Sequence, residues 1–204
     1  MKCGKRKDHS KNRHMSSELK LTVPVPISLN HYKGMRTFIK NGKPMTTVYV
    51  KKEAVEYKEN FKQYLIEEIQ KQNWNIEVND KQHFYVDAVF YFDRIDKDTD
   101  DYSKILLDAI TETQKIWKDD NTALFRPLRI YYDNKNPRLE LTIYPVEYVG
   151  IFDTHEELKK FEEKCETCRR HKNNCRLLAK AKEGRIQEEI QNLECSKYKE
   201  KKEN

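Results

Sequence analysis

The run at residues 84–92 reads Phe-Tyr-Val-Asp-Ala-Val-Phe-Tyr-Phe, and its aromatic and β-branched content is typical of a β-strand. An acidic segment follows at residues 98–101. Apolar residues then recur at helical spacing: they are Ile105, Leu106, Ala109, Ile110, Ile116 and Trp117. The chain is therefore expected to pass from a strand, through a cluster of carboxylates, into an amphipathic helix.

The acidic segment predicts a metal site. Asp98 and Asp100 are two residues apart, so in extended chain they face the same side. Two carboxylates this close repel unless a cation or proton lies between them, and Mg²⁺ typically uses one or two carboxylates with waters and phosphate oxygens. Lys104 lies one turn further on, where its ammonium could stabilise charge on a phosphate, and Asp119-Asp120 could add a carboxylate. The alternative is a solvated acidic loop with an ordinary i,i+4 ion pair.

These residues resemble the RusA-type Holliday-junction resolvases, small endonucleases of bacteria and their phages. That family carries Asp-x-Asp-Asn, a lysine four residues later, Asp-Ala-Leu, and then Trp-x-Asp-Asp. The matching segments are Asp98-Thr99-Asp100-Asp101, Lys104, Asp108-Ala109-Ile110 and Trp117-Lys118-Asp119-Asp120. Two earlier segments also look like the family's: Pro24-Val25-Pro26-Ile27-Ser28-Leu29-Asn30-His31-Tyr32 and Glu53-Ala54-Val55-Glu56-Tyr57. The resemblance covers residues 19–148.

The resemblance implies that Asp98, Asp100 and Asp120 are the catalytic, metal-binding carboxylates and that Lys104 is the catalytic lysine. It also implies a homodimer that resolves four-way DNA junctions by paired symmetric nicks, with Mg²⁺ as cofactor and Mn²⁺ as a substitute. The process served would be recombination, repair or phage DNA processing. Two positions depart from the family pattern. Asp101 replaces an asparagine, and the spacer before Asp120 is about one residue longer, which leaves Asp119 as the alternative third carboxylate.

The remaining patterns predict an α+β (mixed α/β) domain over residues 18–150, with a single mixed sheet and two main helices. Strands are expected at residues 19–23, 128–132 and 139–144. A hairpin is expected from residues 36–40 and 45–50, because Asn41-Gly42 suits the positive φ angles of a tight turn. Apolar residues at helical spacing predict the first main helix at residues 51–72.

Composition separates the chain into regions. Charged residues make up 36% and hydrophobic residues 37% of the chain, so not all of it is expected to be core. With no apolar run long enough to cross a membrane and no apolar signal region, the protein is expected to be soluble and cytoplasmic, in a bacterial cell or a phage-infected host. Residues 1–17 hold many lysines and arginines without apolar periodicity. This basic segment is expected to be a disordered arm that contacts DNA phosphates, or else a solubilising tail.

Residues 151–204 differ in kind, because Lys and Glu dominate and helix-forming residues run almost unbroken. A helical extension is expected. Cys165, Cys168, His171 and Cys175 could bind a structural Zn²⁺. Ten residues of straight helix would separate Cys165 from Cys175 by about 15 Å, so the site needs a break at Asn173-Asn174 or a ligand from elsewhere, such as Cys195. Alternatively, the cysteines pack along one helical stripe.

Two other function classes remain open at this point. One is a non-catalytic protein that binds DNA junctions, which the carboxylates argue against, because binding a polyanion gains nothing from acids that face it. The other is a partner-recruiting protein that acts through its Cys-rich tail. Resolvase activity is the interpretation that accounts for the ordered series of motifs.

Overall fold

The computed structural model describes residues 17–79, 81–171, 173 and 175–201. The chain divides into two compact units, Met1–Pro145 and Val146–Asn204. Almost all of the basic arm expected at residues 1–17 lies outside the described residues. None of the helices in the described ranges is long and apolar enough to span a lipid bilayer.

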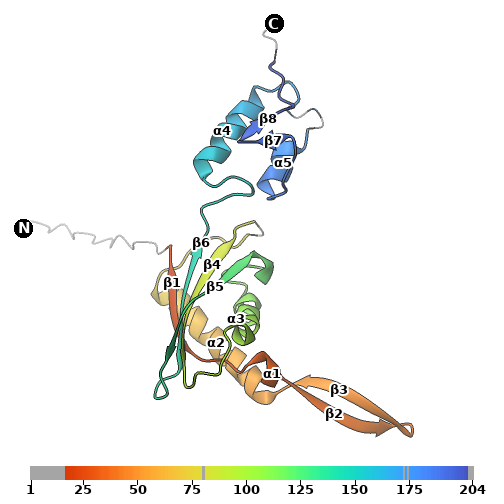
Figure 1. Cartoon of the computed structure of the whole chain (residues 1–204), viewed down its shortest axis with the longest axis vertical. Helices are drawn as coiled ribbons and strands as arrows, with labels where there is room; N and C mark the ends of the chain where they lie inside the picture. The colour runs from red at the N-terminus through yellow and green to blue at the C-terminus, as the bar shows by residue number, and fades with distance from the viewer. Residues whose placement is uncertain (1–16, 80, 172, 174, 202–204) are drawn as a thin grey trace, which may run out of the picture. The chain divides into compact units, whose positions relative to one another are not determined.

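The first unit is built on a four-stranded mixed sheet (Figure 1). Its strands are β1 (Leu19–Pro24), β4 (Phe84–Phe92), β5 (Ala123–Tyr132) and β6 (Arg138–Pro145), in the order β1-β6-β4-β5. β6 pairs antiparallel with both β1 and β4, whereas β4 and β5 are parallel. The prediction of one main mixed sheet is confirmed, although β5 begins earlier than the sequence pattern indicated.

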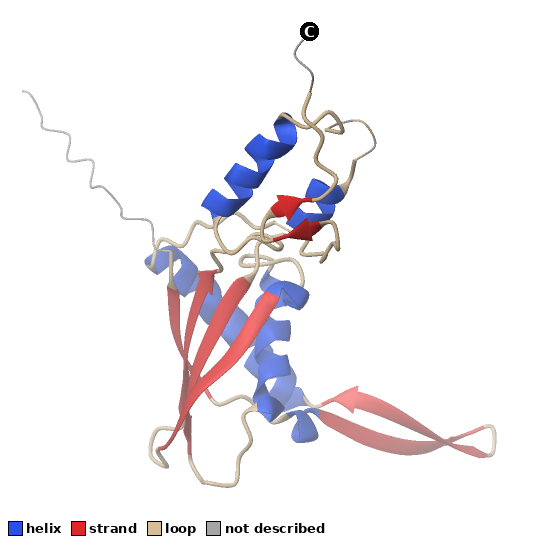
Figure 2. Cartoon of the chain, turned by 45° about the horizontal axis from the view of Figure 1, so that its top comes forward, coloured by secondary structure: helices blue, strands red, loops and turns tan. Residues whose placement is uncertain are grey.

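Two helices, α2 (Lys52–Lys71) and α3 (Asp100–Thr113), cover one face of this sheet (Figure 2). Alternate residues of β4 are fully buried on that face, and they include Phe84, Phe90 and Phe92. Leu65 of α2 and Leu106 of α3 pack in the same apolar cluster. The period of two in the strand and the helical period in α3 both follow the sequence pattern. The expected pair of main helices is thus confirmed.

The other face of the sheet carries the intervening residues of β4. There the Asp87 carboxylate accepts two hydrogen bonds from Arg126 of β5, at 2.6 and 2.9 Å, and one from the Tyr144 hydroxyl of β6, at 2.9 Å. The Arg126 guanidinium also lies 3.7 Å from the centre of the Tyr85 ring. These contacts tie the three strands together on the face that the helices leave open.

The short helix α1 (Leu29–Tyr32) leads into the predicted hairpin, which forms β2 (Lys33–Lys40) and β3 (Lys43–Val50). Asn41 and Gly42 form its turn with φ angles of 52° and 73°, in the left-handed region that these residues tolerate best. The hairpin is a separate two-stranded sheet that extends away from the main sheet (Figure 1).

The second unit contains α4 (His155–Glu166), α5 (Leu177–Lys182), β7 (Ile190–Gln191) and β8 (Glu194–Cys195). Its small core consists of Phe152, Leu158, Phe161 and Ala181. The expected helical extension is only partly present, because helix in the described residues of this unit is confined to α4 and α5. Gly184 takes a φ of 77°, and Asn192-Leu193 form a left-handed turn between the two short strands, so the chain folds back on itself despite its helix-forming composition.

Candidate active site

The N-terminus of α3 carries the first two predicted carboxylates. Asp100 is the first residue of α3, and Asp98 lies in the segment that joins β4 to this helix. Both side chains are exposed. Among the described residues, no hydrogen bond or ion pair involves the carboxylate of either one. Their oxygens are therefore available to a ligand at the positive end of a helix dipole.

Lys104 lies one turn further along α3, and its Nζ is 3.2 Å from Oδ1 of Asp108. The hydrogen bond to Asp108 is the main reason that the pKa of Lys104 is raised, and the charges of Asp120 and Tyr32 act in the same direction. The ordinary i,i+4 ion pair is therefore present. The same ammonium also interacts electrostatically with Asp120, which lies outside α3.

The Asp119-Asp120 pair lies at η1 (Asp120–Thr122), a single turn that contacts α3. Oδ1 of Asp119 accepts a hydrogen bond from the backbone N–H of Asn121 at 2.9 Å, so Asp119 caps this turn. Asp120 is half-buried and interacts electrostatically with Lys104. The geometry favours Asp120 over Asp119 as the third carboxylate.

Trp117 fixes the approach to this turn. Its side chain is fully buried, and its indole Nε1–H donates a hydrogen bond of 2.7 Å to Oγ1 of Thr111, near the end of α3. Its ring packs against Phe84 of β4, with ring centres 5.9 Å apart. The tryptophan of the sequence motif thus anchors the segment that leads to Asp120, rather than taking part in the chemistry.

One contact at the site was not predicted from the sequence. Nδ2 of Asn30, in α1, donates hydrogen bonds of 3.1 and 3.3 Å to the two oxygens of Asp101. The sequence marked Asp101 only as a departure from the family pattern, whereas in the structure it ties α1 to the start of α3. Asn30 belongs to the early segment that resembles the family's, and this resemblance was the available signal.

The predicted ligands do not form a complete set of metal ligands in the part of the chain that the structure describes. Among the described residues, no three or more His, Cys, Asp or Glu side chains are arranged so that they could hold a metal ion. Asp98 and Asp100 lie at the start of α3, Asp120 interacts electrostatically with Lys104, and all three offer carboxylate oxygens. This donor set fits Mg²⁺, which binds proteins through one or two carboxylates and completes its shell with water and phosphate oxygens.

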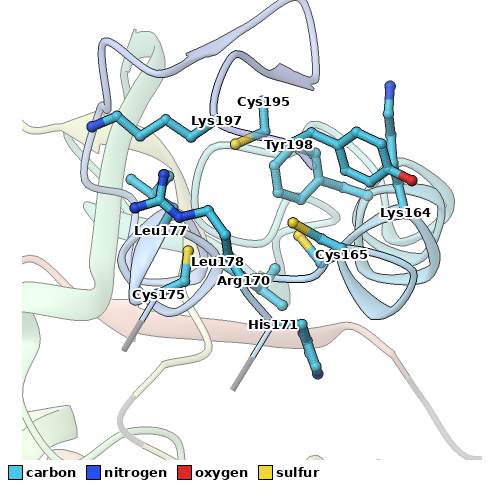
Figure 3. Close-up of a pocket in the computed structure, with 12 residues that line it drawn as sticks. Lys164, Cys165, Arg170, His171, Cys175, Leu177, Leu178, Cys195, Lys197 and Tyr198 are labelled. Atoms are coloured by element: carbon cyan, nitrogen blue, oxygen red, sulfur yellow. The ribbon is translucent and has the colours of Figure 1, made fainter. Parts of the chain in front are cut away.

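The second unit gathers the described cysteines around one pocket (Figure 3). Cys165, Cys168, Cys175 and Cys195 all line it, together with His171. Burial raises the pKa of Cys165 to about 11, and the neighbouring thiols add to the rise. Because α4 ends at Glu166, Cys165 and Cys168 do not share one helical stripe with His171.

A mixed sheet, with carboxylates and a lysine at the start of the helix that follows a central strand, has the groups that phosphodiester hydrolysis requires. A comparison with protein families supports this class. The family model described as Endodeoxyribonuclease RusA matches residues 24–144, which span the hairpin, both large helices, η1, β4, β5 and nearly all of β6. The chain therefore belongs to the RusA family of endodeoxyribonucleases. A search of curated proteins found no match.

Proposed function

We propose that this chain is a Mg²⁺-dependent, structure-specific endodeoxyribonuclease that resolves four-way DNA junctions. The observation that supports the proposal is that Lys104, which pairs with Asp108, also interacts electrostatically with Asp120. Lys104 belongs to the helix that begins at the exposed Asp100, two residues after the exposed Asp98. Membership in an endodeoxyribonuclease family supports the reaction class. The preference for junctions and the need for Mg²⁺ are the parts that experiment must test.

In this mechanism, Asp98, Asp100 and Asp120 would hold the ion. Bound Mg²⁺ supplies activation of the attacking water and stabilisation of the leaving oxygen. Lys104 would donate to a non-bridging oxygen of the scissile phosphate and offset the charge that grows there in the transition state. Asp108 would keep the ammonium oriented, and the first N–H groups of α3 would favour a phosphate at this end of the helix.

Resolution of a junction needs two cuts on opposed strands. A homodimer with a two-fold axis presents two equivalent sites to a nearly two-fold junction, so we propose that the active form is a dimer. Sedimentation of the protein with and without a junction would test this assignment. Cleavage by a stable monomer would contradict it.

The decisive experiment compares a synthetic four-way junction with linear duplex and flap substrates, in Mg²⁺ and in EDTA. Asp100→Asn should abolish junction cleavage, because the variant loses a carboxylate that binds the metal. Junction binding should stay intact or become stronger, because the same negative charge also repels phosphate. Asp153→Asn is the matched control, since Asp153 is an exposed aspartate of the second unit. Near-normal Mg²⁺-dependent cutting by Asp100→Asn would refute the mechanism.

The role of Lys104 is separable from simple phosphate binding. Lys104→Ala should lower the single-turnover cleavage rate more than it lowers junction affinity, because its contact is strengthened mainly in the transition state. Equal losses in rate and affinity would reassign Lys104 to ground-state binding of the phosphate.

The third carboxylate is tested by a pair of neighbouring variants. Asp120→Asn should lose cleavage, whereas Asp119→Asn should retain most of it, because asparagine is also a good capping residue and can still accept the hydrogen bond from Asn121. The reverse order of activities would move the role to Asp119.

The hairpin is the proposed contact with the DNA backbone. Every charged residue of β2 and β3 is basic: Lys33, Arg36, Lys40 and Lys43. The strand register places Arg36, Phe38, Lys40, Lys43 and Tyr49 on one face. Cations interleaved with aromatic rings suit phosphates and unstacked bases, which a junction exposes at its centre.

Charge reversal tests this contact. Arg36→Glu and Lys43→Glu should each weaken junction binding and reduce the slope of log affinity against log salt by about one, since each removes one phosphate contact. Lys159→Glu, on an exposed position of α4 in the second unit, is the matched control. Unchanged salt slopes in both hairpin variants would place the hairpin off the DNA.

A further inference from the structure

Four cysteines from separate segments of the second unit converge on one pocket. Cys165 is in the last turn of α4, Cys168 is in the turn that follows, Cys175 precedes α5, and Cys195 is in β8. Figure 3 shows the sulfur atoms of Cys165, Cys175 and Cys195 around a common space, with the His171 ring turned away from them. The cavity that they help to line has a volume of about 40 Å³, more than the roughly 10–15 Å³ that a single water needs.

The backbone around Cys168 is held in place by the C-terminal segment. The Lys199 N–H points at Sγ of Cys168 at 3.5 Å, and the Lys199 carbonyl accepts a hydrogen bond of 2.7 Å from the Arg169 N–H. Cys168 and Glu200 form an isolated antiparallel bridge. The Cys168 N–H in turn bonds to the Cys165 carbonyl at 3.0 Å. Backbone hydrogen bonds therefore hold the turn with the Cys-x-x-Cys spacing in one conformation.

The apolar core of this unit is small for its length. Only Phe152, Leu158 and Phe161, with Ala181, form its buried cluster. Chains below about 70–80 residues rarely reach stable folding on such a core alone, and they use disulfides or a structural metal in addition. All four cysteines are free thiols in the structure, so no disulfide supplies this stabilisation among the described residues.

We propose that Cys165, Cys168, Cys175 and Cys195 are the ligands of one structural Zn²⁺. Four thiolates in a tetrahedron are a common zinc donor set, and the spacing pairs a Cys-x-x-Cys turn with two cysteines from distant segments. The side chains of the described residues do not yet form a group that could hold a metal. Ligation therefore requires the four sulfur atoms to come closer together than they are in this structure.

In this donor set Cys195, the alternative that the sequence left open, replaces His171 as the fourth ligand. The hairpin of β7 and β8 brings Cys195 to the pocket from a distance along the chain that spacing alone does not reveal. One ion would thus join the end of α4, the segment before α5 and the β7–β8 hairpin. This role is independent of the nuclease site.

The first test measures zinc in the purified full-length chain after dialysis. We expect about one zinc per chain, which falls to background in Cys195→Ser and stays near one in His171→Ala. Cys3→Ser, at the remaining cysteine, controls for metal held elsewhere. Absence of zinc from wild-type protein that has been reduced and supplied with Zn²⁺ would overturn the proposal. Metal retained by Cys195→Ser but lost by His171→Ala would overturn the donor set.

A second measurement guards against a variant that fails to fold. Alkylation of wild-type chain, followed by mass spectrometry, should show Cys165, Cys168, Cys175 and Cys195 protected together in Zn²⁺ and exposed together after chelation. Co²⁺ in place of Zn²⁺ should give the intense sulfur-to-metal charge-transfer absorption of a thiolate site. Independent reactivity of the four thiols, or Co²⁺ spectra without that absorption, would instead identify them as packing residues. Junction cleavage is not part of either readout, so the nuclease proposal can fail separately.

Discussion

Thr111→Val isolates the hydrogen bond that anchors the approach to Asp120. Valine keeps the shape of threonine but removes Oγ1, the acceptor that lies 2.7 Å from Nε1 of Trp117. Because Trp117 is fully buried, its N–H cannot turn to water instead. An unsatisfied buried donor costs about 1–3 kcal/mol, a large fraction of a total stability of about 5–15 kcal/mol. Valine and threonine have similar helix propensities, so the loss should come from the hydrogen bond.

Thr111→Ser is the matched control, because serine keeps the hydroxyl and loses only a methyl group, worth about 0.8 kcal/mol or less. Urea unfolding, followed by tryptophan fluorescence and circular dichroism, measures both variants. Trp74 and Trp117 are the chain's two tryptophans, and both lie in the first unit, so the fluorescence reports on that unit. A Val variant as stable as the Ser variant would refute the reasoning.

The remaining predictions concern the charge of Lys104 and a glycine of the second unit. Because Asp108 raises the pKa of Lys104, the pair's stabilisation is present below the unfolded-state pKa of lysine and is lost as pH rises through the folded-state pKa. Asp108→Asn should therefore move the alkaline decline of cleavage to lower pH, in addition to any loss of rate at neutral pH from a less well oriented ammonium; an unmoved decline would remove Lys104 from the reaction. Gly150 has a φ of 62°, and an added Cβ would lie 2.0 Å from the Ala181 carbonyl oxygen. Gly150→Ala should thus speed hydrogen exchange in the second unit only, and unchanged exchange there would contradict the clash.

The sequence by itself determined the elements of the first unit and their faces. Aromatic and β-branched residues predicted β4, the helical period predicted α3, and Asn41-Gly42 predicted the hairpin turn, because each signal depends on neighbouring residues along the chain. The motif around Asp98 and Lys104 could also be recognised from the sequence, because its residues lie close together between the end of β4 and the first turns of α3. These local signals were enough to indicate the family.

The sequence predicted the secondary structure of the second unit less well. Its Lys- and Glu-rich composition suggested long helix, yet the left-handed turn at Asn192-Leu193 and the Gly184 bend shorten the helical part. Propensity alone could not show this, because tertiary packing around Phe152 and Phe161 decides where each helix ends.

Only the tertiary structure decided which distant residues meet. The place of β6 between β1 and β4, the hydrogen bonds from Asn30 to Asp101, and the arrival of Cys195 beside Cys165 leave no periodic trace along the chain. Such contacts join segments whose spacing varies with the loops between them, and they form because burying apolar faces brings those segments together. The physical reason is that local patterns fix the conformation of each segment, whereas packing of the whole chain fixes which segments become neighbours.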